Sequence, residues 1–296
     1  MRDHPKFKAY SALLAVYFFW GTTYLGIRMA LESFPPLMMI STRFLLSGTI
    51  LLIAARLMGA TLPKGRELFL TAFYGLVILG GGNGCLTFSE LWIPSGLAAL
   101  FITTSPFWMV GLEAALPGGE RLHLPSLAGI AVGFLGVLFL VIPEAAGASA
   151  GGSVLKGFLI LQLGCFLWSL GAILQRRQPT RAHPVVSGAV QQLATGLAYL
   201  GPAALMNERS VDWSERGVWA LGYLVVFGSI VGYSAFVYVL RALPVAIVST
   251  YNYVNPIVAV FLGWLFYREP FSLRHAAAMI AIFLGVALVK YHTPKA

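Results

Sequence analysis

The chain has 296 residues, of which 58% are hydrophobic and only 10% are charged, and its mean hydropathy is +0.80. Soluble domains carry about 25% charged residues, which cover their surface. The composition therefore excludes a water-soluble enzyme, a disordered chain and a disulfide-stapled secreted domain, and it leaves a protein that crosses a membrane many times.

Long apolar runs follow one another along the whole sequence. A helix needs about 20 apolar residues to cross the hydrocarbon core of a bilayer. We predict ten such spans, at residues 9–31, 36–57, 67–88, 94–116, 124–143, 153–175, 184–206, 217–240, 244–266 and 271–290. The expected fold class is therefore an all-α integral membrane protein with ten transmembrane helices, and its function must lie among the helices because every loop is short.

Lys and Arg are unequally divided between the two sides of the predicted membrane. If the N-terminus is inside, most of the 20 Lys and Arg residues fall on the inner side. Basic residues concentrate on the cytoplasmic side of membrane proteins, so we predict a multi-pass protein of the cell inner membrane with both termini cytoplasmic. The same distribution explains the net charge of +9 without a nucleic-acid partner.

Residue types that bind metals or cofactors are sparse. The five His residues lie in loops, tails or span ends, and neither Cys85 nor Cys165 belongs to a CxxC pair. The sequence also lacks a G-x-x-x-x-G-K-[ST] phosphate-binding loop, which excludes ATP as the energy source. We therefore predict no metal, no cofactor and no enzymatic activity.

The two halves of the sequence resemble each other. The residues that keep their order and spacing in both halves are Trp20 and Trp168, Pro36 and Pro184, Pro94 and Pro244, Pro106 and Pro256, and Glu120 and Glu269. We expect repeats at 1–146 and 153–296, joined by a linker at 147–152. Because each repeat has five spans, the second enters the membrane inverted. Such 5 + 5 inverted-topology repeats are typical of secondary transporters, although some channels share them.

Three segments add a family resemblance that covers nearly the whole chain: Phe18–Leu46, Ser95–Trp108 and Phe266–Leu288. With them the sequence resembles the drug/metabolite transporter superfamily, in particular its EamA-type members with two repeats. Within that group it is most similar to aromatic amino acid exporters of the YddG type. The resemblance implies export of amino acids and other metabolites through a cavity between the repeats. It also implies that spans 3, 4, 8 and 9 form most of the wall and that spans 1 and 6 gate it.

Asp, Glu and His are absent from the middle of every predicted span, and Glu90 and Glu113 come closest to one. A proton-coupled carrier usually needs an intramembrane titratable group. The sequence therefore favours facilitated diffusion or exchange down a gradient. Sodium coupling stays open, because carbonyl and hydroxyl oxygens can bind sodium.

Aromatic residues recur in the middle of spans. Tyr17, Trp20 and Tyr24 share one helical face, and Trp168 is the repeat counterpart of Trp20. Phenol and indole groups at this depth need a hydrogen-bond partner or a wet cavity. We expect Trp20, Tyr24 and Trp168 to line a cavity, with packing inside the bundle as the alternative.

The segment 249–258 is the most polar stretch within a predicted span. Tyr251, Asn252 and Asn255 would be costly against lipid, and Pro256 leaves the carbonyl of Asn252 without its helical donor. Pro106 interrupts the first repeat in the same way. Paired interruptions point to a transport site, and two ordinary proline kinks are the alternative.

Two arginines are the only charges well inside spans. Arg28 and Glu32 are i, i+4 neighbours and could pair with each other. Arg43 has no such neighbour, so it either extends toward the interface or attracts the carboxylate of a substrate. Asn83 and Tyr233 complete the predicted polar and aromatic lining.

The sequence therefore predicts a secondary transporter that moves small metabolites by alternating access. Amino acids with aromatic or other neutral side chains are the expected cargo, and the lipid bilayer is the other expected partner. The alternatives are a drug or a nucleotide-type cargo, proton coupling, or a channel.

Overall fold

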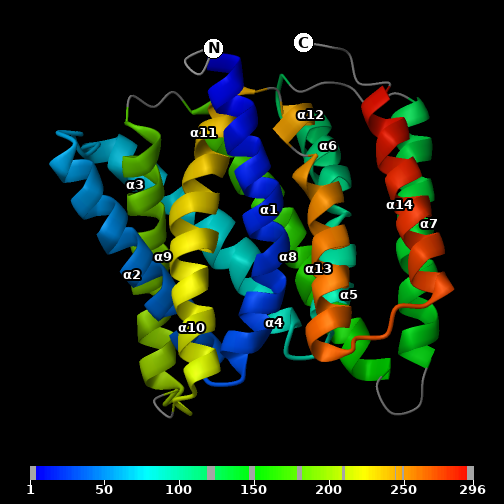
Figure 1. Cartoon of the computed structure of the whole chain (residues 1–296). Helices are drawn as coiled ribbons and strands as arrows, with labels where there is room; N and C mark the ends of the chain where they lie inside the picture. Colours follow the sequence, from blue (N-terminus) through cyan, green and yellow to red (C-terminus); the bar gives the residue numbers. More distant parts are fainter. Residues whose placement is uncertain are drawn as a thin grey trace.

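The structure is a computed structural model that describes residues 5–118, 124–146, 151–178, 182–208, 211–243, 245–248 and 250–291. Within these ranges it contains helices, turns and bends and no strand. The long helices run between two ends of one bundle (Figure 1). We call the end where α1 (Pro5–Leu31) begins and α14 (Leu273–Tyr291) ends the upper end, and the opposite end the lower end.

Two similar series of helices follow each other along the chain. The first comprises α1, α2 (Pro36–Leu57), α3 (Gly65–Gly75), the π-helix η1 (Leu76–Asn83), α4 (Gly84–Ser89), α5 (Ser95–Ile102), α6 (Ser105–Ala115) and α7 (Leu124–Ala146). The second comprises α8 (Gly151–Arg177), α9 (Pro184–Leu205), α10 (Glu215–Tyr223), the π-helix η2 (Leu224–Tyr233), α11 (Ser234–Ala242), α12 (Val245–Val248), α13 (Tyr251–Tyr267) and α14. Each predicted span coincides, within four residues at either end, with one of these helices or with a consecutive run of them.

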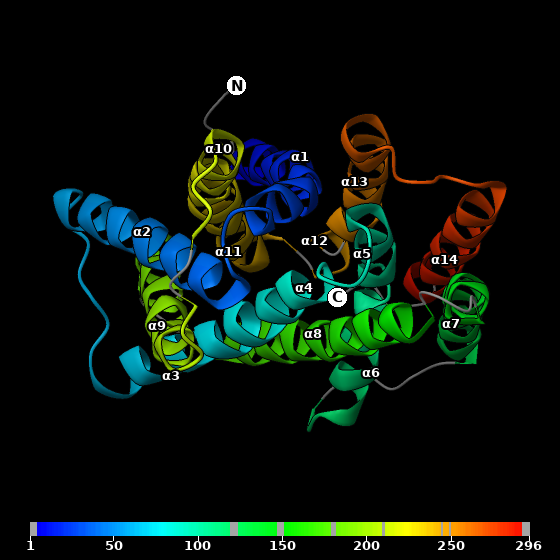
Figure 2. The ribbon, with the colours of Figure 1, turned by 90° about the horizontal axis from the view of Figure 1, so that it is seen from below.

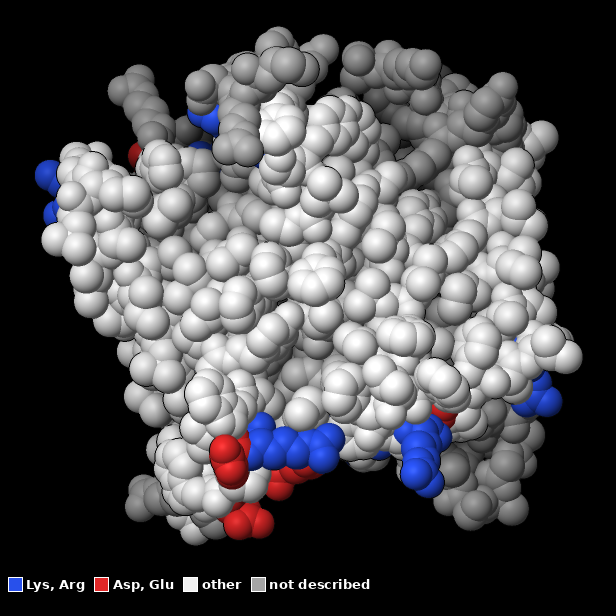
Figure 3. All heavy atoms as spheres, viewed as in Figure 1, with Lys and Arg blue, Asp and Glu red and all other residues white. Residues whose placement is uncertain are grey.

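The outer surface of the bundle suits a membrane. Figure 3 shows charged side chains near the two ends and an uncharged belt between them on the face in view. In the described part of the chain, the segments long and apolar enough to cross a membrane are Pro36–Leu57, Gly65–Ser89, Ser95–Ala115, Ser153–Arg177 and Glu215–Ala242. Two shorter apolar segments are Leu127–Phe139 and Leu273–Gly285. The number of ten crossings therefore stays a prediction.

Counterpart helices of the two halves lie side by side. α2 packs along α9, and α7 packs along α14 (Figure 2). Glycines permit the first contact, because a Cβ at Gly48 would lie 2.9 Å from the backbone nitrogen of Leu193. A Cβ at Gly196 would lie 2.8 Å from that of Leu45. Small residues at the same place in both repeats thus bring the two backbones together.

The predicted interruptions are only partly matched between the halves. In the first half the helix breaks at Thr103 and Thr104, and Pro106 follows in the first turn of α6. In the second half α12 ends before residue 249 and α13 begins at Tyr251, so Pro256 lies inside a continuous helix. The expectation of breaks at matching prolines was therefore wrong for Pro256, since the second break comes about one turn earlier.

Candidate functional site

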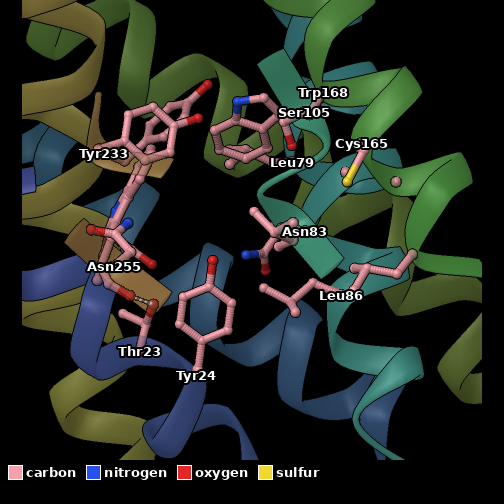
Figure 4. A pocket seen from close by; sticks show the side chains of 18 of the residues that line it. Thr23, Tyr24, Leu79, Asn83, Leu86, Ser105, Cys165, Trp168, Tyr233 and Asn255 are labelled. Atoms are coloured by element: carbon pink, nitrogen blue, oxygen red, sulfur yellow. Dashed lines mark hydrogen bonds between the residues drawn. The ribbon is translucent and has the colours of Figure 1, made fainter. Parts of the chain in front are cut away.

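A cavity lies between the two halves (Figure 4). Its wall comes from α1, α2, η1, α4 and the α5–α6 region of the first half, and from α8, η2 and α13 of the second. The predicted residues that line it are Trp20, Tyr24, Arg43, Asn83, Trp168, Tyr233, Tyr251 and Asn255. The wall therefore includes the expected spans 3, 4, 8 and 9, and span 2 contributes to it as well.

Three of the predicted residues lie outside this wall: Pro106, Asn252 and Pro256. Helix geometry explains the pattern in α13, because residues four apart share a face and adjacent residues do not. Tyr251 and Asn255 therefore face the cavity together, and the residue that follows each of them does not. In the first half it is Ser105, next to Pro106, that lines the cavity.

Trp20 is at the centre of an aromatic cluster. Its ring centroid lies 5.4 Å from that of Trp168, 5.3 Å from that of Tyr251 and 5.0 Å from that of Phe236. Its indole nitrogen donates to the carbonyl of Gly228 at 3.1 Å, which fixes the ring and satisfies its polar group. This cluster forms a rigid apolar surface on one side of the cavity.

Polar groups face the same space. In Figure 4 the hydroxyl of Tyr24 and the amide of Asn83 point into the cavity. With its amide nitrogen turned toward them, Asn255 donates to the carbonyls of Tyr251 and Tyr17 at 3.1 and 2.9 Å. That orientation leaves the amide oxygen of Asn255 as an acceptor. The hydroxyl of Tyr233 instead donates to Gln191 at 2.8 Å, so Tyr233 contributes its ring.

Arg43 is buried in the wall, with 4% of its surface exposed. Its Nε donates to the hydroxyl of Ser229 at 2.8 Å, and one terminal nitrogen lies 3.4 Å from Oδ1 of Asn83. The guanidinium also lies 5.0 Å from the ring centre of Phe44. Among the described residues no carboxylate forms an ion pair with it. Arg43 therefore does not extend to the interface, and it brings a positive charge with neutral partners to the cavity.

The lower end contains charges that are paired. Arg28 lies 3.4 Å from Glu269, not beside Glu32 as the i, i+4 spacing suggested. Glu269 also accepts from the backbone nitrogens of Ser95 and Gly96 at 3.0 and 2.9 Å, at the start of α5. The local pairing was wrong because the end of α13 lies beside α1 here and supplies a buried carboxylate.

Glu32 pairs instead with two residues of the second half. It lies 3.5 Å from Arg216, in the first turn of α10, and accepts a hydrogen bond from Tyr267 at the end of α13. Together with the contacts of Glu269, these interactions connect α1, α5, α10 and α13 at the lower end. Glu120, the repeat counterpart of Glu269, lies outside the described residues.

A protein family matches both halves of the chain. The EamA-like transporter family matches the chain twice, over residues 7–142 and 155–291. The chain belongs to the EamA-like transporter family. It thus contains the EamA domain of the drug/metabolite transporter superfamily in duplicate, which agrees with the expected repeat.

The relatives of this EamA protein are membrane transporters. It is 35% identical to the uncharacterised inner membrane transporter YedA of Escherichia coli K12, over 98% of this chain and 92% of the relative. It is 29% identical to a probable amino-acid metabolite efflux pump of the same organism, over 74% of each chain. A solved crystal structure with 22% identity covers 95% of both chains with a TM-score of 0.70, which supports the fold alone.

Sequence reasoning missed several residues of the wall. They are Thr23, Phe44, Leu79, Gly82, Leu86, Ile102, Ser105, Leu161, Gly164, Cys165, Gly228 and Ser229. A signal existed for Gly82 and Gly228, since each π-helix contains glycine beside a polar residue within an apolar run. A Cβ at Gly82 would lie 2.9 Å from the ring of Trp168. Glycine there lets η1 approach α8 closely.

Proposed function

We propose that this EamA-family chain is a secondary transporter whose cargo is an amino acid with an aromatic or other bulky neutral side chain. Arg43 supports this most directly, because a carboxylate is the cargo group that would pair with a buried guanidinium held by neutral partners. The aromatic cluster around Trp20 suits the side chain. The oxygens of Tyr24 and Asn255 are placed to accept from an ammonium group.

We also propose a 5 + 5 inverted repeat of ten membrane-spanning helices, with units at 1–146 and 153–296 and a linker at 147–152. The matching order of elements and the paired contacts of α2 with α9 and of α7 with α14 support it. Basic residues on the side of the upper end support cytoplasmic termini in a cell inner membrane. Two such halves can expose a central cavity to either side in turn.

Three alternatives differ from this proposal: a nucleotide-type cargo, a drug and a channel. A phosphorylated or nucleotide-type cargo would need several cations, whereas Arg43 is the single Lys or Arg in the cavity wall that the structure describes. A drug without a carboxylate would give the Arg43 guanidinium no negative partner, so the charge would have no part in binding it. A channel would conduct its solute without saturation, whereas a carrier exchanges solute and saturates.

The test is exchange of labelled phenylalanine by the purified protein in liposomes loaded with unlabelled phenylalanine. We expect saturable exchange by the wild-type protein. Trp20→Ala removes the ring at the centre of the aromatic cluster and should weaken apparent affinity about tenfold, since an aromatic contact contributes ~1.5 kcal/mol.

Trp264→Ala is the matched control, because Trp264 is 55% exposed on the outside of the bundle and lies outside the cavity wall. It should exchange phenylalanine as the wild-type protein does. Absence of wild-type exchange, or equal losses in the two variants, would argue against this cargo and this site. Thermal unfolding of both variants distinguishes a transport defect from a folding defect.

A further inference from the structure

Glu90 follows the last residue of α4, one turn beyond Leu86 of the cavity wall. Only 6% of its surface is exposed, and neither carboxyl oxygen has a hydrogen-bond partner in the described part of the chain. Its position between the cavity and the lower end sets it apart from Glu113, an exposed residue that pairs with Arg177. The cargo site proposed above makes no use of Glu90.

The titratable groups near Glu90 do not neutralise it by direct contact. They are Arg43 on α2, Tyr24 and Arg28 on α1, and Glu269 after α13. Each of the two cations has another partner. Arg28 pairs with Glu269, and Arg43 donates to Ser229.

An ionised carboxylate in this position would be unfavourable, because it would be desolvated without a hydrogen bond or a contacting cation. Glu90 lies just beyond the membrane-spanning segment Gly65–Ser89. Burial raises the pKa of its carboxyl well above the usual range, and the Glu269 carboxylate acts in the same direction, whereas Arg28 and Arg43 lower the pKa by less. This environment therefore favours the neutral acid over the carboxylate.

We propose that Glu90 is a proton-binding site through which transport is coupled to the movement of a proton. The coupling rests on the proposed transport function, whereas the proton site rests on the burial of Glu90. While the contacts of Arg28, Glu32 and Glu269 keep the lower end closed, the Glu90 carboxyl retains its proton. When those contacts separate, water reaches the carboxyl, its O–H bond breaks and the proton passes to water.

The first experiment detects the proton without any cargo. Infrared spectra of the full-length protein in lipid nanodiscs at neutral pH should contain the carbonyl band of a protonated carboxylic acid. Glu90→Gln should remove this band, because the amide cannot hold the acid proton. Glu113→Gln, which changes an exposed carboxylate, should leave it unchanged. A wild-type spectrum without a band assignable to Glu90 would overturn the proton site.

The second experiment tests coupling in liposomes with labelled phenylalanine and a trapped pH dye. In the wild-type protein and in Glu113→Gln, an imposed pH gradient should change net uptake several-fold, and phenylalanine flux should move protons. Glu90→Gln should retain exchange between equal concentrations and lose both responses. Exchange that ignores the pH gradient in the wild-type protein, or that depends on Na⁺ instead, would overturn the coupling.

The two proposals fail in different ways. Wild-type protein without any phenylalanine exchange would contradict the cargo, while the infrared band would still decide whether Glu90 binds a proton. Working exchange without proton movement would contradict the coupling and leave the cargo proposal intact. If Glu90→Gln does not fold, the wild-type protein can still overturn the proposal, either by an infrared spectrum without the band of a protonated carboxylic acid or by exchange that ignores the pH gradient.

Discussion

The cavity and the lower end both contain arginine, but the partners of the guanidinium differ between them. Arg43 is buried and donates to neutral oxygens, whereas Arg28 and Arg216 are partly exposed and face carboxylates at 3.4 and 3.5 Å. A buried charge without a counter-ion lowers stability, and selection retains it chiefly for function. The comparison indicates that pairs at the lower end connect helices, while the charge in the cavity is available to a ligand.

Arg43→Gln should produce the largest effect on cargo binding. It removes the charge and keeps a polar group in the wall, so phenylalanine loses a charge-assisted hydrogen bond worth ~2 kcal/mol, or about thirtyfold in affinity. Competition against labelled phenylalanine measures this loss. Phenylethylamine, which has no carboxylate, should compete poorly against labelled phenylalanine for the wild-type protein. Its affinity for the variant should be no lower than its affinity for the wild type.

Arg216→Gln is the matched control for this prediction, because it removes an arginine whose partner is the carboxylate of Glu32 at the lower end. Its affinity for phenylalanine should stay within about twofold of wild type, since exposed pairs contribute ~0.5 kcal/mol. If the two variants lost affinity equally, the distinction between the two arginine environments would be wrong. Removal of the buried charge should also leave the Arg43→Gln protein at least as heat-stable as wild type.

Glu269→Gln tests the other side of the comparison. Glu269 is 9% exposed and accepts from Ser95 and Gly96 as well as pairing with Arg28. An amide can replace only one of its two oxygens, so the variant should lose ~2 kcal/mol of stability. We expect a lower thermal unfolding midpoint for the purified protein.

For Glu269→Gln the control is Glu113→Gln, whose carboxylate is 39% exposed and pairs with Arg177 at the upper end. Its unfolding midpoint should change little, because exposed ion pairs contribute less than ~1 kcal/mol. A shift as large as that of Glu269→Gln would mean that the lower-end contacts contribute no more to stability than an exposed ion pair does. Phenylalanine affinity should change in neither variant, since both residues lie outside the cavity wall.

Much of this architecture could be predicted from the sequence, because membrane crossing imposes long apolar runs. Each predicted range coincides with helices, and the repeat found from matching Trp and Pro residues agrees with the duplicated EamA domain. Trp20, Tyr24 and Trp168 were placed toward a cavity by their depth and helical spacing, and all three line one. Polar groups within such apolar runs are costly against lipid, so they face the protein interior or a water-filled cavity.

The remaining features depend on contacts between distant segments. The i, i+4 rule favoured Glu32 for Arg28, but the packing of α13 against α1 supplied Glu269 instead. Glu90 was expected near a span end, and only the surrounding helices make it buried. The prediction of facilitated diffusion rested on the absence of Asp, Glu and His from the middle of the spans, and it took no account of a buried carboxyl at a span end.

Gly228→Ala is the most delicate test, because it leaves the charge of Arg43 in place and changes only its position. A Cβ at Gly228 would lie 2.9 Å from Nη2 of Arg43 and 2.9 Å from Cγ2 of Thr23, so the guanidinium must shift by a few tenths of an ångström. Weaker alignment with the carboxylate should cost ~1 kcal/mol, about fivefold in phenylalanine affinity. Gly222→Ala on α10 is the control, since its Cβ would meet nothing within 4 Å and alanine favours the helix. Equal affinities in the two variants would show that the position of the Arg43 charge does not matter, and the carboxylate would then need another partner in the cavity.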